Sequence, residues 1–513
     1  MTSLSTAAPP AGPLDAHDHG TIAGFRQVLD LHGFGGDAVL TAFGSPVAST
    51  DSHRRIDLPL YLRRLAPASP LHTLIKLFVL DQQVDEDAVR AAVSPLTVAD
   101  LRALGLVETA AHGVRARVRL SAYDGLVLAH DRYDESEPTL SHDHVLNVNP
   151  TTIALSGLTV RRKVGSTLDV GTGCGVLAIL AARHSEQVIG IDTNPRALNL
   201  AAFNAALNNV HNVEWRLGSL FEPVAGSRFD LIVCNPPYVI SPESRYVFRD
   251  SGRRGDAICE EIVRSIPQYL AEGGFASMLC NWALGPGEGW SVPPARWVAD
   301  RGCDSWVLSR GAQDPLTYAA GWNRTSDPAA YDEALNRWTA YFEELGIESI
   351  GLGAIILRRR AGGQNWMRSD MLSESPAGSC GRQIERIFAA QDVLPAVADD
   401  RALLDRAFRV ADDTRVQQIL APRDGTQVAE RSEIHLTSGF RFRGAVDAQT
   451  IRLLQRCDGS RRLAEIAREL AQEVPMSPEQ AAAATADTVR GLLAWGFVIP
   501  ADADGGDLSP NRP

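Results

Sequence analysis

Short apolar runs typical of strands alternate with longer runs typical of helices between residues 167 and 360. The strand-like runs include TLDVG, VIGID and DLIVCN, and the helical runs include VLAILAARH and ALNLAAFNAALN. Strands that alternate with helices are joined by crossovers, which lay the strands parallel in one sheet with helices on both faces. The sequence therefore predicts an α/β fold built on a doubly wound, mostly parallel sheet.

The chain of 513 residues is too long for one hydrophobic core, so we expect several domains. The sequence before the α/β region is mainly helical. The sequence after it follows a stretch rich in Gly, Ser and Pro and ends in helices and a short strand. The predicted organisation is a disordered tail (1–20), an N-terminal helical or winged-helix-like domain (21–118), the α/β domain (119–360), a linker (361–380), a C-terminal winged-helix-like accessory domain (381–501) and a disordered tail (502–513).

Cysteine usage indicates the cellular compartment, and net charge limits the kinds of partner that the chain can bind. Seven cysteines form no CxxC pair and several lie in apolar runs, which favours free buried thiols in the reducing cytoplasm. No apolar stretch reaches the roughly 20 residues of a membrane span, so we expect a soluble protein with no membrane partner. A net charge of −12 argues against binding nucleic acid over the whole surface. The net charge does not exclude a local basic patch, for which the short basic runs at residues 161–163, 253–254 and 358–360 are candidates.

A glycine-rich turn follows the first strand of the α/β region. Gly171, Gly173 and Gly175 lie where a strand ends and a helix begins, and glycine lets a ligand approach the backbone closely. The dinucleotide fingerprint of dehydrogenases would require glycine where Val176 stands. The candidate cofactor-binding residues of this turn are Asp169, Gly171, Thr172, Gly173, Cys174 and Gly175.

The next strand ends in Asp192, a carboxylate placed to accept hydrogen bonds from ribose hydroxyl groups. The alternative is that Asp192 caps the helix that Pro195 begins.

A buried strand, residues 229–234, runs directly into Asn235, Pro236, Pro237 and Tyr238. Two prolines cannot continue a ladder, so this loop is stiff. It can present the Asn235 side-chain oxygen and the Pro236 carbonyl as two acceptors beside the flat ring of Tyr238. These groups suit the planar NH2 of an amide or a nucleobase. Methyl transfer to such a nitrogen depends mainly on positioning. The alternative is a plain rigid turn.

Later loops fall at the same edge of the predicted sheet. Trp282, Trp290 and the stretch DPLTY, residues 314–318, follow the later strands. They either shape a substrate pocket or pack in the core.

Residues 167–275 resemble the class I methyltransferases, and among them the release-factor glutamine N5-methyltransferase (HemK-type) family. The turn D-x-G-T-G-x-G, Asp192 and the N-P-P-Y motif carry the resemblance. It implies a seven-stranded sheet, S-adenosyl-L-methionine as the cofactor, and adenine contacts from Ser219 and Leu220, with Ser219 replacing the family's usual acid. The family's proline-containing loop over the cofactor corresponds to Asn149, Pro150, Thr151 and Thr152. Arg254 stands where the family's G-G-x-D-G has its acid.

These observations predict an S-adenosylmethionine-dependent N-methyltransferase that uses Asn235, Pro236, Pro237 and Tyr238 for catalysis, with Asn235 also among the cofactor-binding residues. The expected acceptor is a protein glutamine amide, and the first alternative is an RNA base, at adenine N6 or guanine N2. The second alternative is a non-catalytic cofactor-binding scaffold, and the third is a nucleotide-dependent oxidoreductase. Substrate contacts are expected from Pro150, Thr152 and Arg254. We expect no metal, because His142 and His144 lack further ligands at fixed spacing.

Overall fold

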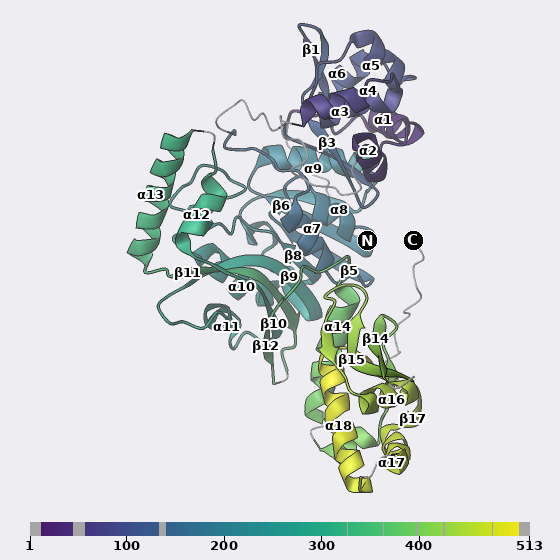
Figure 1. The fold of residues 1–513 in the computed structure, drawn as a ribbon. Coiled ribbons are helices and arrows are strands. Elements are labelled where there is room, and N and C mark those ends of the chain that lie inside the picture. The colour runs from purple at the N-terminus through teal and green to yellow at the C-terminus, as the bar shows by residue number, and fades with distance from the viewer. Residues whose placement is uncertain are drawn as a thin grey trace. The chain divides into compact units, whose positions relative to one another are not determined.

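The computed structural model describes residues 12–44, 57–132, 140–325, 327–362, 364–396, 399–423, 426–473 and 476–501. The chain forms two compact units, and Figure 1 labels those of their elements that the view leaves room for. The first unit comprises residues 1–156 and 162–371, and the second comprises residues 157–161 and 372–513. Among the described residues, no helix is long and apolar enough to cross a membrane.

The first unit begins with a helical module that ends in a hairpin. Its elements are α1 (His19–Leu31), α2 (Gly36–Phe43), α3 (Leu58–Arg64), α4 (Pro70–Leu74), a π-helical turn (Ile75–Val79), α5 (Glu86–Val93), α6 (Val98–Ala103), β1 (Val107–Ala110) and β2 (Gly113–Ala116). Thr97 and Asp100 form a capping box at the start of α6. Residues 12–20 differ from the tail predicted for 1–20, because Leu14 is buried and α1 begins at His19.

The α/β region begins with a separate hairpin, β3 and β4. Its helices and strands are β3 (Arg119–Tyr123), β4 (Leu126–His130), α7 (Pro150–Gly157), β5 (Val164–Val170), α8 (Val176–Ala181), β6 (Ser185–Asp192), α9 (Pro195–Leu207), β7 (Val213–Leu217), a 3₁₀ turn (Glu222–Val224), β8 (Phe229–Cys234), α10 (Ala257–Tyr269), β9 (Leu270–Leu284), α11 (Val292–Val298), β10 (Cys303–Gln313), α12 (Pro315–Asn323), α13 (Pro328–Leu345), β11 (Ser349–Arg359) and β12 (Met367–Met371).

The main sheet has eight strands in the order β12-β10-β11-β9-β8-β5-β6-β7. β7, β6, β5, β8 and β9 are parallel to one another, β11 is antiparallel to both β9 and β10, and β12 is parallel to β10. The predicted doubly wound, mostly parallel sheet is therefore confirmed. It has one strand more than the predicted seven. The additional strand is β12, which lies within the stretch that was expected to be a linker, residues 361–380, and pairs with β10.

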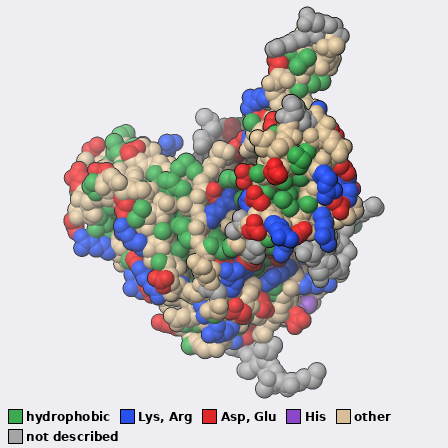
Figure 2. All heavy atoms as spheres, turned by 90° about the horizontal axis from the view of Figure 1, so that it is seen from below, with side chains coloured by type: hydrophobic (Ala, Val, Ile, Leu, Met, Phe, Trp, Pro, Cys, Tyr) green, Lys and Arg blue, Asp and Glu red, His purple; other side chains and the backbone are tan. Residues whose placement is uncertain are grey.

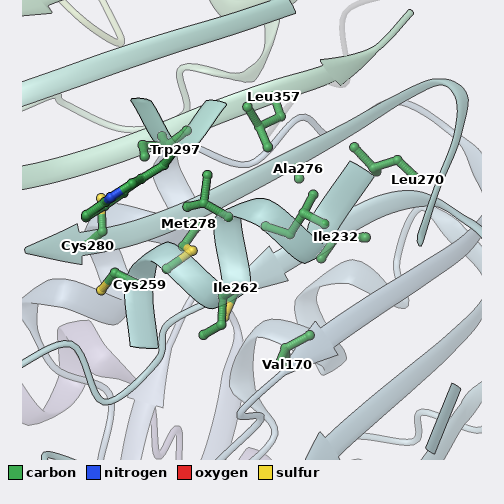
Figure 3. Close-up of a cluster of buried hydrophobic side chains, with 14 of the residues drawn as sticks. Val170, Ile232, Cys259, Ile262, Leu270, Ala276, Met278, Cys280, Trp297 and Leu357 are labelled. Atoms are coloured by element: carbon green, nitrogen blue, oxygen red, sulfur yellow. The ribbon is translucent and has the colours of Figure 1, made fainter. Parts of the chain in front are cut away.

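Helices cover both faces of this sheet. On one face, α10 and α11 pack their apolar side chains against β5, β8 and β9, and Figure 3 shows this core. On the other face, Ala178 and Ala181 of α8 meet Val188 of β6, and Trp215 packs against them. Because side chains alternate along a strand, successive residues of β5 serve the two faces in turn.

All seven cysteines are free and buried, as the sequence predicted.

The second unit contains two small sheets, ordered β17-β13-β18 and β14-β15-β16. Its apolar core draws on most of its helices. The elements are α14 (Gly381–Ala396), α15 (Asp400–Leu404), β13 (Ala407–Val410), β14 (Thr414–Arg423), β15 (Thr426–Leu436), β16 (Arg443–Ala445), α16 (Ala448–Arg456), β17 (Asp458–Arg462), α17 (Leu463–Glu473), α18 (Pro478–Ala494) and β18 (Val498–Pro500). The tail predicted at residues 502–513 lies outside the described residues.

Three asparagines, two within α9 and one at its C-terminal end, form side-chain hydrogen bonds with the backbones of neighbouring segments. Asn199 donates to and accepts from Leu14, and Asn208 does the same with Val127. Asn204 accepts from the Ala129 N–H at 2.7 Å and donates to the carbonyl oxygens of Ala129 and Cys174, each at 2.9 Å. Since Cys174 belongs to the glycine-rich turn, α9 ties that turn to the hairpin β3–β4.

Replacing Asn204 with Ala should destabilise the first unit by about 3 to 5 kcal/mol, because one buried donor and two buried acceptors lose their partners. Urea denaturation monitored by tryptophan fluorescence measures the unfolding of this unit, because eight of the nine tryptophans lie in it. Asn336→Ala is the matched control, because Asn336 is exposed on α13, and the expected change is within about 0.5 kcal/mol. Equal effects of the two substitutions would contradict this account of α9.

Candidate functional site

The register of two parallel strands brings the two predicted motifs together. β5 pairs with β8 so that Val170 lies opposite Cys234. The next residues, Gly171 and Asn235, therefore leave the sheet side by side at its carboxyl edge. A Cβ atom added to Gly171 would lie 3.8 Å from the Asn235 backbone oxygen. Ligands of open α/β sheets bind at this edge.

The glycine-rich turn requires glycine for two different reasons. Gly171, Gly173 and Gly175 have φ angles of 74°, 55° and 85°, in the left-handed region that other residues rarely adopt. A Cβ atom on Gly175 would also lie 2.9 Å from the Ala201 Cβ atom, so this residue fits α8 closely against α9. A Cβ atom on Gly173 would meet no described atom within 4 Å, so the turn faces open space there.

Asp169 braces this turn from behind. Its Oδ2 atom accepts hydrogen bonds from the Thr172 hydroxyl at 2.6 Å and from the Ala178 N–H at 3.0 Å. The carboxyl is fully buried, and its Oδ1 atom has no hydrogen-bond partner among the described residues. Burial raises the pKa of Asp169 to about 7, and the two hydrogen bonds oppose the rise.

Asp192 stands at the end of β6, beside the turn. Its carboxylate accepts hydrogen bonds from the Gly173 N–H at 2.8 Å and from the Asn194 N–H at 2.9 Å. Burial raises its pKa, and these backbone donors oppose the rise. The N-cap of α9 is Asn194, whose side chain accepts from the Arg196 N–H, so Asp192 does not have the capping role that the alternative gave it.

A cavity of about 480 Å³ opens between these motifs. The sequence-predicted residues that line it are Thr152, Gly171, Thr172, Gly173, Cys174, Asp192, Ser219, Leu220, Asn235, Pro236 and Pro237. Leu220 has a φ angle of 48°, and such uncommon backbone conformations concentrate at functional sites.

Five predicted site residues are not among the residues that line the cavity: Asp169, Gly175, Tyr238, Pro150 and Arg254. Asp169 and Gly175 shape the turn from its protein side. Arg254 is exposed and forms an ion pair with Glu344 at 2.8 Å, whereas its neighbour Arg253 lines the cavity. The predicted substrate contact of Arg254 therefore has no support in this cavity.

The Asn235 loop presents one acceptor without a partner. The Asn235 Oδ1 atom is shielded from solvent and makes no hydrogen bond among the described residues, whereas Nδ2 lies 3.5 Å from the Thr151 hydroxyl. The Pro236 carbonyl accepts from the Tyr238 N–H at 2.8 Å, which leaves one of its two lone pairs. Burial raises the pKa of the Tyr238 phenol, and a hydrogen bond with Thr151 opposes the rise.

Two further segments form other walls of the cavity, and the sequence prediction included neither His142 and His144 nor residues 247–248 among its site residues. One contains His142, His144 and Asn149, and the other contains Val247 and Phe248. The His144 and Phe248 rings meet edge to face at 6.1 Å, and the Val247 N–H donates to the His142 carbonyl. The two segments are about a hundred residues apart in sequence, and no local pattern in either one signals the contact.

The helical pair α12–α13 buttresses the loop that follows Asn235. Tyr318 of α12 is buried, and its hydroxyl oxygen accepts from the Ile240 N–H at 3.1 Å and from the Asn281 side chain at 2.8 Å. Glu243 pairs with Arg337 of α13 at 3.0 Å. Of the two interpretations of residues 314–318, packing behind the site is the one that the structure supports for Tyr318.

Comparison with known proteins gives one match to the α/β region and two to its flanks. Residues 141–286 match the family described as methyltransferase small domain. Residues 32–117 and 385–500 match models described only as domains of unknown function, DUF7059 and DUF7782.

Individual relatives match the same region. A putative protein N5-glutamine methyltransferase of Methanocaldococcus jannaschii is 33% identical over 29% of this chain and 77% of its own length. A release factor glutamine methyltransferase of Aliivibrio fischeri is 35% identical over 26% of this chain and 55% of its own. A ribosomal RNA small subunit methyltransferase C of Alcanivorax borkumensis is 31% identical over 27% of this chain and 36% of its own. The chain thus spans about half of the bacterial release-factor relative.

The pKa of Asp169 predicts a pH dependence of stability. Because its pKa rises from 3.8 to about 7, the folded chain keeps a proton that the unfolded chain has released in that range. The stability that this proton contributes is lost as the pH rises through about 7. The free energy of unfolding should therefore fall by about 3 kcal/mol from pH 4 to pH 7.5 relative to that of Asp169→Asn. Urea denaturation at several pH values measures both proteins, and parallel pH curves would rule out the raised pKa.

Removing the Tyr318 hydroxyl should loosen the loop after Asn235. Tyr318→Phe leaves the Ile240 N–H and the Asn281 side chain without their acceptor, so amide exchange at Ile240 should accelerate by about tenfold or more. Hydrogen exchange with mass spectrometry detects the change in the peptide that contains residues 236–245. Tyr331→Phe is the control, because the Tyr331 hydroxyl makes a longer contact, 3.4 Å, with the Ala320 carbonyl. An unchanged exchange rate in Tyr318→Phe would show that α12 does not hold this loop.

Proposed function

The chain belongs to the methyltransferase small domain family of class I methyltransferases, and from that premise we propose that its acceptor is a planar nitrogen, the side-chain amide of a protein glutamine. The observation that carries the proposal is the Asn235 Oδ1 atom, which is buried and without a partner among the described residues at the cavity wall. A buried acceptor left unpaired costs about 1–3 kcal/mol, so such groups mark a missing ligand or a strained site.

The cavity residues fit S-adenosyl-L-methionine. The left-handed glycines leave open space at Gly173, where a ligand can approach the backbone. The Asp192 carboxylate can accept from ribose hydroxyl groups, and Ser219 and Leu220 line the wall beyond it. The cofactor would supply a methyl group on a positively charged sulfonium, which a nitrogen can displace. No metal is part of the proposal.

Asn235 has the central role in this reaction. Its Oδ1 atom and the remaining lone pair of the Pro236 carbonyl can accept the two hydrogens of an amide NH2 group. The Tyr238 ring stiffens the loop from its position between two apolar clusters. Fixing both hydrogens directs the nitrogen toward the methyl group, and such alignment can supply several kcal/mol of barrier reduction. With the cofactor bound, the nitrogen held by Asn235 and Pro236 would take the methyl group as the carbon–sulfur bond broke, and it would then release one proton to solvent.

Surface charge favours a protein acceptor over RNA. Among the described residues, Arg253, Arg254, Arg358 and Arg360 of the basic runs form ion pairs inside the chain, which leaves these cations less available to phosphates. On the face that Figure 2 draws, Lys and Arg side chains are interspersed with Asp and Glu side chains. The contacts of the basic runs are Arg162 with the Gly273 carbonyl, Arg253 with Glu261, Arg254 with Glu344, and Arg358 and Arg360 with Asp304.

The names of the relatives agree with this proposal. The relatives from Methanocaldococcus jannaschii and Aliivibrio fischeri are named glutamine methyltransferases, and the ribosomal RNA methyltransferase is similar over a smaller share of its own length.

Methyl transfer from labelled S-adenosylmethionine to fractionated cell extract tests the proposal. Wild-type protein should label the protein fraction, and Asn235→Ala should lower turnover about 100-fold or more while changing cofactor affinity less than about threefold. Asn336→Ala on exposed α13 should behave as wild type. If the label enters only the RNA fraction, the acceptor is an RNA base and not a protein glutamine. Cofactor binding without transfer to either fraction would favour a scaffold, and binding of NAD in place of S-adenosylmethionine would favour an oxidoreductase.

A further inference from the structure

A short chain of hydrogen bonds leads from the backbone of α7 to Asn235. The Asn149 Oδ1 atom accepts from the backbone N–H groups of Thr151 at 3.1 Å and Thr152 at 2.9 Å. It also accepts from the Thr151 hydroxyl at 2.7 Å. The Thr151 hydroxyl oxygen in turn lies 3.5 Å from the Asn235 Nδ2 atom.

From this arrangement we propose that Thr151 is a positioning residue that determines which way round the Asn235 side-chain amide lies. The inference rests on the proposed function, since it concerns the acceptor atom that Asn235 would offer to a substrate NH2 group.

The orientation of the first side chain in this series is fixed by obligatory donors. Backbone N–H groups can only donate, so the Asn149 side chain must turn its oxygen, and not its nitrogen, toward Thr151 and Thr152. Asn149 thereby caps the N-terminus of α7, and its amide has one permitted sense.

The Thr151 hydroxyl links the orientation of the Asn149 side-chain amide to that of Asn235. With its proton donated to Asn149, the hydroxyl oxygen has only lone pairs to offer on its other sides. The Asn235 amide must then turn its NH2 group toward Thr151. A flipped amide would place the Asn235 oxygen against the Thr151 oxygen, two acceptors without a proton between them.

The consequence is an oxygen left for a substrate. With Nδ2 turned toward Thr151, Oδ1 is the Asn235 atom without a partner among the described residues. The contact of 3.5 Å is long for a hydrogen bond, and such contacts often shorten when a substrate binds. Thr151 also contacts the Tyr238 hydroxyl, so one side chain touches both ends of the N-P-P-Y loop.

Thr151→Val tests the inference, because valine keeps the shape of threonine and lacks the hydroxyl. Turnover should fall about threefold to tenfold with cofactor affinity unchanged, as expected for the loss of one hydrogen bond that acts on alignment. Thr151→Ser keeps the hydroxyl and should stay within about twofold of wild type. Thr167→Val is the matched control, because the Thr167 hydroxyl pairs with Ser185 outside the cavity.

A second measurement does not depend on turnover. In protein labelled with nitrogen-15 at asparagine, the Asn235 NH2 signals are identified by their loss in Asn235→Asp. These signals should shift, and exchange faster with solvent, in Thr151→Val but not in Thr151→Ser or Thr167→Val. Unchanged signals in Thr151→Val would overturn the inference whatever the kinetics. Shifted signals with wild-type turnover would show that the sense of the amide does not serve the reaction.

Failure of the proposed function gives a different result. If wild-type protein transfers no methyl group to any fraction, the acceptor proposal fails. The nuclear magnetic resonance signals of Asn235 still decide whether Thr151 sets the sense of its amide.

Discussion

The parallel pairing of β5 with β8 is the constraint on which the rest of the site depends. Its register sets Val170 opposite Cys234, so the glycine-rich turn and the Asn235 loop leave the sheet as neighbours. A shift by one residue would send every side chain of β5 to the other face of the sheet. Asp169 would then lose the Thr172 hydroxyl and the Ala178 N–H that it holds behind the turn. One strand pair therefore positions both the glycine-rich turn and the Asn235 loop.

Local chemistry explains what the sequence could predict. Positive φ angles require glycine at 171, 173 and 175, and a strand cannot continue through Pro236 and Pro237, so these motifs are visible in a single stretch of chain. The alternating pattern likewise predicted the mostly parallel sheet. The sequence did not show which residues of a motif face the cavity. Asp169 and Gly175 belong to the glycine-rich turn, but they face the protein and not the cavity.

Contacts between distant residues explain what the sequence could not predict. Thr151 lies 84 positions before Asn235, and Tyr318 lies 78 positions after Ile240. The short strand β12, with sequence MRSDM, lacks the apolar alternation of a buried strand, and it is added to the sheet only because β10 leaves an edge for it. The contacts that support the Asn235 loop thus depend on the tertiary fold, whereas the loop itself follows from local sequence.

A crystal structure of the chain with S-adenosylhomocysteine would test whether the glycine-rich turn and the Asn235 loop form one methyl-transfer site. We expect the ribose hydroxyl groups to lie on Asp192, the adenine beside Ser219 and Leu220, and the sulfur atom to face Asn235. A nucleoside bound elsewhere on the chain, or its absence from this cavity at saturating concentration, would show that the two motifs do not form such a site.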